Sequence, residues 1–106
     1  MKDTVFVKLC VDLHCDWQGL PPDYRIYVDN ELFAERTYRW EKPVYLTEIL
    51  QINAVPDTEY LVTLDDFAPQ IANFKMSNHR VEYCDLPVEF NKCKDKKFRF
   101  KVKNES

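Results

Sequence analysis

Residues 24–40 read Y-R-I-Y-V-D-N-E-L-F-A-E-R-T-Y-R-W and decide the fold class. Apolar and polar side chains alternate on both sides of a short polar segment, Asp29-Asn30-Glu31. A period of two with many aromatic and β-branched residues is typical of paired strands that bury one face. Asp and Asn tolerate the left-handed backbone of a tight turn. The stretch therefore predicts a β-hairpin, but it indicates no reaction.

Alternating segments continue on both sides of the hairpin. We expect strands over residues 5–13, 44–54, 59–64, 72–83, 88–90 and 97–103, with a loop over residues 16–23. Glu48 interrupts the apolar parity of its segment, which favours an irregular or edge-like strand. Within residues 72–83 the apolar side chains change parity around residues 77–80, which predicts a β-bulge or kink.

Seven or eight short strands without an amphipathic helical stretch predict a single all-β domain over residues 1–106. An antiparallel β-sandwich of jelly-roll type would bury one apolar face of each sheet. The core residues expected from the alternation are Val7, Leu9, Val11, Ile26, Val28, Leu32, Val62, Leu64, Val81, Phe98 and Phe100.

Composition excludes several classes of protein. The 45% hydrophobic content argues against a disordered chain, and a single glycine argues against glycine-rich phosphate-binding loops. No apolar run approaches the roughly 20 residues of a membrane span. Residues 1–4 lead straight into an alternating strand, so we expect no signal peptide. The cysteines at 10, 15, 84 and 93 are then expected as reduced thiols, although their even number also permits disulfides.

Charge is distributed unevenly along the chain. From Lys92 onward there are seven basic and two acidic residues, whereas the preceding part has eight basic and sixteen acidic residues. The last predicted strand places its basic side chains on one face: Lys97, Arg99, Lys101 and Lys103. We interpret them as protection of an edge strand against aggregation, because the acidic chain is unlike a nucleic-acid binder. No nucleic-acid or membrane partner is expected.

The sequence suggests no catalytic site, so we expect that the protein is not an enzyme. His14 and Cys15 are neighbours on a strand and point to opposite faces. A zinc site would have to draw on residues whose spacing lacks C-x-x-C: His14, Cys15, His79, Cys84 and Cys93. Four aromatic residues are candidates for binding a ligand or partner, since flat rings stack on sugars and on protein side chains: Trp17, Tyr27, Trp40 and Tyr45. Alternatively, Trp17 and Trp40 cap the ends of the core.

Three segments carry a resemblance to known proteins: R-I-Y-V-D-N-E-L-F-A-E-R-T-Y-R-W, E-I-L-Q-I-N-A-V-P-D-T-E-Y-L-V-T-L and F-K-M-S-N-H-R-V-E-Y. Together they span about Arg25 to Tyr83 and resemble a carbohydrate-binding-module-like β-sandwich. The hairpin with E-R-T-Y-x-W after it is also similar to small uncharacterised proteins of tailed cyanobacterial phages. Asn30 and Asp57 stand where those patterns usually have glycine.

The phage resemblance implies a non-catalytic interaction module. Such a protein would be a virion structural or accessory component that docks to other protein chains, in the virion or the host cytoplasm. The alternative is a calcium-dependent carbohydrate-binding module. The resemblance to calcium-dependent modules implies a calcium site at Asp65 and Asp66, since hard carboxylate oxygens suit that ion. No other cofactor is expected.

Overall fold

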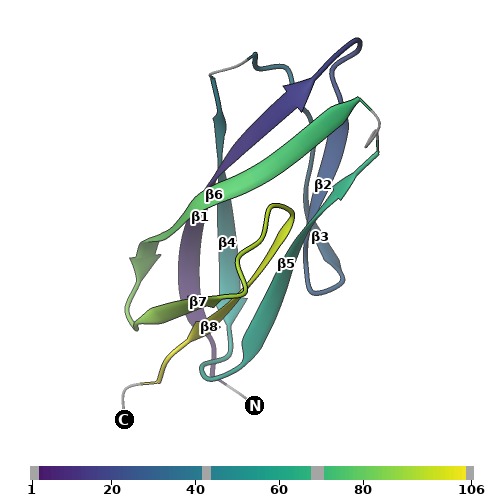
Figure 1. Ribbon diagram of the computed structural model, residues 1–106. Helices are drawn as coiled ribbons and strands as arrows, with labels where there is room; N and C mark the ends of the chain where they lie inside the picture. Colours follow the sequence, from purple (N-terminus) through teal and green to yellow (C-terminus); the bar gives the residue numbers. More distant parts are fainter. Residues whose placement is uncertain (1–2, 42–43, 68–70, 105–106) are drawn as a thin grey trace.

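The computed structural model describes residues 3–41, 44–67 and 71–104 and shows an elongated β-sandwich of 51 × 24 × 20 Å (Figure 1). Within these residues the chain forms strands and turns without a helix, and thus without any helix that could span a membrane. One antiparallel sheet has the order β4-β1-β6 and the other β3-β2-β5-β8-β7. The predicted all-β sandwich is confirmed. Its strands are β1 (Val5–Trp17), β2 (Asp23–Val28), β3 (Glu31–Thr37), β4 (Leu46–Ala54), β5 (Glu59–Asp66), β6 (Ala72–Cys84), β7 (Val88–Asn91) and β8 (Lys97–Val102).

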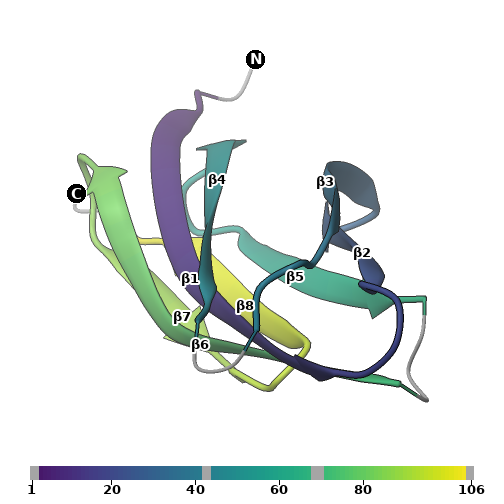
Figure 2. The same ribbon diagram turned by 90° about the horizontal axis from the view of Figure 1, so that it is seen from above.

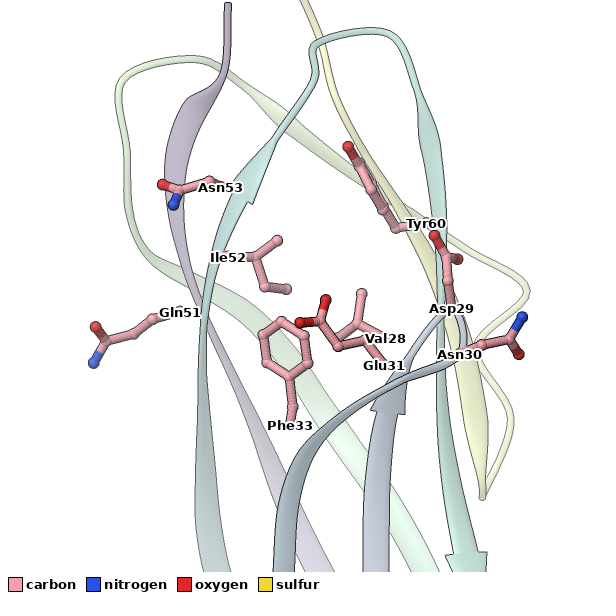
Figure 3. A pocket seen from close by; sticks show the side chains of 9 residues that line it. All are labelled: Val28, Asp29, Asn30, Glu31, Phe33, Gln51, Ile52, Asn53 and Tyr60. Atoms are coloured by element: carbon pink, nitrogen blue, oxygen red, sulfur yellow. The ribbon is translucent and has the colours of Figure 1, made fainter.

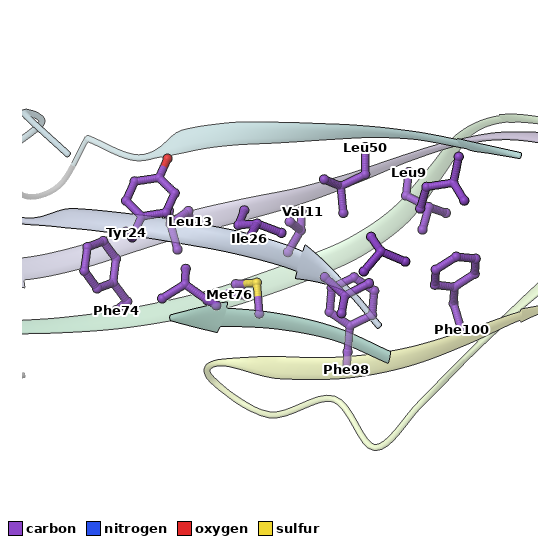
Figure 4. Close-up of a cluster of buried hydrophobic side chains, with 14 of the residues drawn as sticks. Leu9, Val11, Leu13, Tyr24, Ile26, Leu50, Phe74, Met76, Phe98 and Phe100 are labelled. Atoms are coloured by element: carbon purple, nitrogen blue, oxygen red, sulfur yellow. The ribbon is translucent and has the colours of Figure 1, made fainter. Parts of the chain in front are cut away.

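The core lies between the sheets and takes side chains from both (Figure 4). Tyr24 of β2 and Phe74 of β6 meet there, with ring centroids 5.2 Å apart. Such contacts between sheets bury the apolar face that each sheet presents. Most of the predicted core residues are buried: Val7, Leu9, Val11, Ile26, Val28, Val62, Leu64, Phe98 and Phe100.

The prediction of a core position is wrong for two residues, Leu32 and Val81. Leu32 is 47% exposed because β3 contains a bulge: Ile26 pairs with Ala34 and Tyr27 with Leu32, which leaves Phe33 as an extra residue. The bulge reverses the parity of the strand, so Phe33 packs against the core instead. Val81 lies opposite Leu9 but remains 37% exposed, because β6 is the last strand of its sheet.

The long strand β6 carries the predicted irregularity. Its ladder with β1 shifts register between Lys8 and Leu9 and again between Cys10 and Asp12. Asn78, in the middle of the irregular segment, has φ of 53°, a conformation that Asn tolerates better than most residues. The predicted bulge is confirmed.

β1 is longer than predicted. It continues to Trp17, and residues 14–17 pair with residues 72–75 of β6. The prediction of a loop from Asp16 is therefore wrong at its beginning. The inward side chain of this extension is Cys15, which is buried. The sequence does not reveal this position, because a cysteine does not stand out as part of an alternation of aliphatic residues.

The basic strand is not an edge strand, so the interpretation of its basic side chains as protection of an edge against aggregation is wrong. β8 lies between β5 and β7, and its Lys101 lies opposite Glu59 of β5 and Glu89 of β7. Arg99 lies 3.4 Å from Glu59, and Lys103 lies 2.6 Å from Glu89. Arg99 and Lys103 thus form ion pairs with acidic residues of the neighbouring strands.

His79 points to the inside of the sandwich from the bulged part of β6. Its ring packs against Phe98 with centroids 4.6 Å apart, and it also contacts Phe90 at 6.1 Å. Nε2 is buried without a hydrogen-bond partner in the described part of the chain. Burial lowers the pKa of His79, because the apolar surroundings disfavour the imidazolium.

We expect different roles for the inward and outward side chains of β8. Phe100→Ala should lower the free energy of unfolding by about 3–5 kcal/mol, since it leaves a cavity in the core. Replacing Lys97, Arg99 and Lys101 together by Gln should cost only about 1 kcal/mol, because exposed ion pairs contribute little. Urea denaturation of both variants measures the difference. Equal losses would contradict the burial of this strand.

Acid should destabilise the protein through His79. The unfolded chain binds a proton at the ordinary histidine pKa, whereas the folded chain binds it at a lower pKa. Stability that is present above the ordinary pKa, about 6.5, is therefore lost as the pH falls below it. Urea denaturation at pH 7.5 and pH 5.5 should show a larger loss for the wild type than for His79→Leu. Identical losses would show that His79 does not contribute.

Candidate functional site

A cleft of about 590 Å³ lies between β4 of one sheet and the β2–β3 hairpin of the other (Figure 3). Among the described residues, β3 pairs only with β2, and β4 only with β1. An unpaired edge of each sheet therefore borders the open side of the sandwich, as seen from above in Figure 2. The residues that line the cleft are Val28, Asp29, Asn30, Glu31, Phe33, Gln51, Ile52, Asn53 and Tyr60.

The cleft has an apolar floor and a polar rim. Val28 and Ile52 are buried, and the half-buried Phe33 ring lies between them (Figure 3). The Glu31 carboxylate lies beside this ring, whereas Gln51 and the other amide side chains point away from the floor. The bulge in β3 places Phe33 here, because it turns that side chain to the inner face. An apolar floor with a few polar groups is the usual composition of a binding site.

A buried hydrogen-bonded cluster joins β4 to the hairpin outside the residues that line the cleft. Glu48 of β4, whose side chain is 2% exposed, accepts a hydrogen bond of 2.5 Å from the Tyr24 hydroxyl. The same oxygen lies 2.7 Å from Nε of Arg36 on β3. Burial and the hydrogen bond to Glu48 raise the pKa of Tyr24 well above its usual range, so the hydroxyl remains a donor. This cluster ties β4 to the hairpin.

Residues of the hairpin turn and Tyr60 of β5 also line the cleft. Asp29 has φ of 54°, and its N–H donates to the Leu61 carbonyl at 2.6 Å. The Leu61 N–H in turn donates to Asp29 Oδ1 at 3.0 Å. The Tyr60 hydroxyl accepts a hydrogen bond of 2.8 Å from the Val55 N–H, beyond the end of β4. These hydrogen bonds hold the hairpin turn against β5 and Tyr60 against the residue that follows β4.

The four aromatic residues singled out in the sequence make three different sets of contacts. Trp17 Nε1 donates to the Trp40 carbonyl at 2.9 Å, and Trp40 packs edge-on against buried Tyr38, with centroids 5.3 Å apart. Tyr45 contacts His14, with centroids 5.0 Å apart. Tyr27 lines a shallower hollow of about 330 Å³ beside β5. The structure brings Trp17 and Trp40 together but builds no single platform from the four.

Asp65 and Asp66 are adjacent residues at the end of β5, so their side chains leave opposite faces of the strand. Asp66 Oδ2 lies 3.3 Å from Lys96 Nζ. Asp65 is exposed and lies opposite Arg25 in the ladder. In the described ranges, His, Cys, Asp and Glu nowhere gather in groups of three or more that could hold a metal ion. The described cysteines are free thiols.

Sequence reasoning missed two buried carboxylates. Burial would raise the pKa of Asp12, but hydrogen bonds from Asn78, Thr47 and Arg80 hold it below its usual range. These bonds are 2.8–3.1 Å long and occupy the carboxylate on the outer face of its sheet. Glu48 is the second. The break that it makes in the apolar parity of β4 is the signal that could have revealed it.

We expect Glu48→Ala to lower the free energy of unfolding by about 1–3 kcal/mol, because it leaves the buried Tyr24 hydroxyl without an acceptor. Glu48→Gln keeps an acceptor and should lose less. Glu35→Ala is the matched control, since Glu35 forms an exposed pair with Arg25 at 3.3 Å and should cost below about 1 kcal/mol. Denaturation of the three variants compares them, and equal costs for Glu48→Ala and Glu35→Ala would contradict the role of the cluster.

Comparisons with known proteins leave the site to be interpreted from its own residues. The likeness to carbohydrate-binding-module-like sandwiches and to small phage proteins stays a prediction from the sequence. No family model, curated protein or solved structure matches the chain.

Proposed function

We propose that this chain is a non-catalytic interaction module that binds an extended segment of another protein in the cleft between β3 and β4. The observation that supports the proposal is the pair of free strand edges bordering the cleft. A free edge presents backbone N–H and C=O groups without partners, and an added strand satisfies them. The role in a phage virion is part of the proposal and rests on the resemblance alone.

The dimensions of the cleft suit a short extended segment. Glu31 and Phe33 lie on one wall and residues 51–53 on the other. At about 3.3 Å per residue, such walls accommodate roughly three to five residues of a strand. Alternate side chains of that segment would rest on the floor around Phe33, while the others would face the polar rim. Backbone pairing supplies affinity in this mode, and the pockets for alternate side chains supply specificity.

Glycan binding is supported less well by the geometry. The four rings expected to stack on a sugar do not line the cleft, whose aromatic residues are Phe33 and Tyr60. A sugar would also leave the backbone groups of both edges without partners. We therefore treat glycan binding as an alternative outcome of the test.

The test is selection from a display library of random twelve-residue linear peptides, followed by amide hydrogen exchange with a selected peptide bound. We expect added protection in residues 31–37 and 46–54, because a strand paired to these edges covers their amides. Residues of the other edge strands, β6 and β7, should be unchanged and serve as the internal control. Protection confined to β6 or β7, or saturable binding on a glycan array without any peptide binder, would overturn the proposal.

Substitutions at two neighbouring residues test whether the selected peptide binds in the cleft. Phe33→Ala removes the aromatic ring from the floor of the cleft. It should weaken peptide binding about tenfold, because the free energy lost is that of burying part of one apolar side chain. Leu32→Ala is the control, because Leu32 is 47% exposed and lies outside the cleft lining. Equal affinities of the two variants would place the binding site elsewhere.

A further inference from the structure

We infer that the segment bound in the cleft carries a lysine or arginine within two positions of an apolar side chain. The inference rests on the proposed docking function and adds the chemistry of the partner. Its basis is the charge of the cleft, the position of Glu31, and the way in which charge is divided between the two ends of the larger sheet.

The charged side chains of the cleft are both acidic. Asp29 and Glu31 line it together with three amides, and no lysine, arginine or histidine is among the lining residues. Asp29 uses Oδ1 to accept the Leu61 N–H. Glu31 makes no ion pair or hydrogen bond within the described residues, unlike Glu35, which pairs with Arg25 on the same hairpin. The cleft therefore offers an unpaired carboxylate to a ligand.

The surroundings of Glu31 favour a cation of a protein segment. Its carboxylate lies beside the Phe33 ring and close to Val28 (Figure 3). A segment that covers this floor also excludes water, and attraction between opposite charges strengthens as the local dielectric falls. An acidic side chain in the same place would meet repulsion that the rim amides cannot relieve. The same cleft thus selects for an apolar side chain and for a neighbouring basic one.

The arrangement of the larger sheet extends this preference beyond the cleft. In the order β3-β2-β5-β8-β7, the basic strand β8 lies three strands away from β3. The part of the chain that precedes Lys92, which includes both walls of the cleft, has sixteen acidic and eight basic residues. Charge of one sign around a cleft attracts ligands of the opposite sign and raises their association rate. The position of β8 keeps its basic residues away from the acidic lining of the cleft.

The test compares three blocked heptapeptides with the full chain by NMR titration. The first is Thr-Lys-Val-Thr-Val-Lys-Thr, and the other two replace both lysines by glutamine or by glutamate. We expect the lysine peptide to bind about fivefold more tightly than the glutamine peptide, and the glutamate peptide to bind most weakly. The preference for lysine should shrink in 1 M NaCl, because salt screens the attraction.

Charge reversal in the protein provides the matched pair of variants. Glu31→Lys should reverse the order, so that the glutamate peptide binds most tightly. Glu41→Lys changes the net charge equally, but Glu41 is exposed and lies outside the cleft lining, so the order should be that of the wild type. If Glu41→Lys reverses the order as well, the preference comes from net charge and the assignment to Glu31 is wrong.

The outcomes separate this inference from the docking function. If the lysine and glutamine peptides bind equally and both protect residues 31–37 and 46–54 from exchange, docking stands and the charge preference is wrong. If none of the three binds, the library decides: enrichment of lysine or arginine beside apolar residues supports the inference, and selected peptides without that enrichment overturn it. If the library yields no peptide that protects these edges, both proposals fail.

Discussion

The hydrogen-bonded carboxylate of Glu48 is the interaction on which the open side of the sandwich depends. A buried charge is costly unless hydrogen bonds and an opposite charge compensate it, and here Tyr24 and Arg36 supply both. These partners belong to one sheet and Glu48 belongs to the other, so compensation is possible in only one alignment of the hairpin with β4. Beyond this cluster the two strands share no further pairing, and the space between them becomes the cleft.

Irregularities in two strands determine what the inner surfaces present. A strand of strict alternation would place Phe33 outside and Leu32 inside, and the bulge in β3 exchanges them. The bulge in β6 likewise accompanies an inward imidazole, His79, which packs against Phe98. In both cases one extra residue changes which chemical group faces the interior. The apolar floor of the cleft is therefore a product of the irregular backbone as much as of composition.

The sequence predicts where the strands lie along the chain better than it predicts which strands are adjacent in a sheet. Alternation is a local property, and it correctly assigned the hairpin, the parity change in β6 and most of the core. Sheet order depends on pairing between residues far apart in the chain, so β8 was placed at an edge although β7 covers it. The cleft escaped prediction for the same reason, since β3 and β4 meet across different sheets. Aromatic residues such as Trp17 and Tyr45 were identified by type, but their grouping depends on that long-range arrangement.

The central position of β1 affects how the chain folds during its synthesis. This strand is made first, yet its partners are β4 and β6, the latter extending to Cys84. Until those residues have left the ribosome, the inward face of β1 has no completed sheet to join and no opposite layer to cover it. Pairing between distant segments is slow to form, and unpaired apolar strands associate with other chains in the meantime. The apolar face of β1 therefore waits for partners during synthesis, and a factor that covers this face in the meantime would favour folding over association.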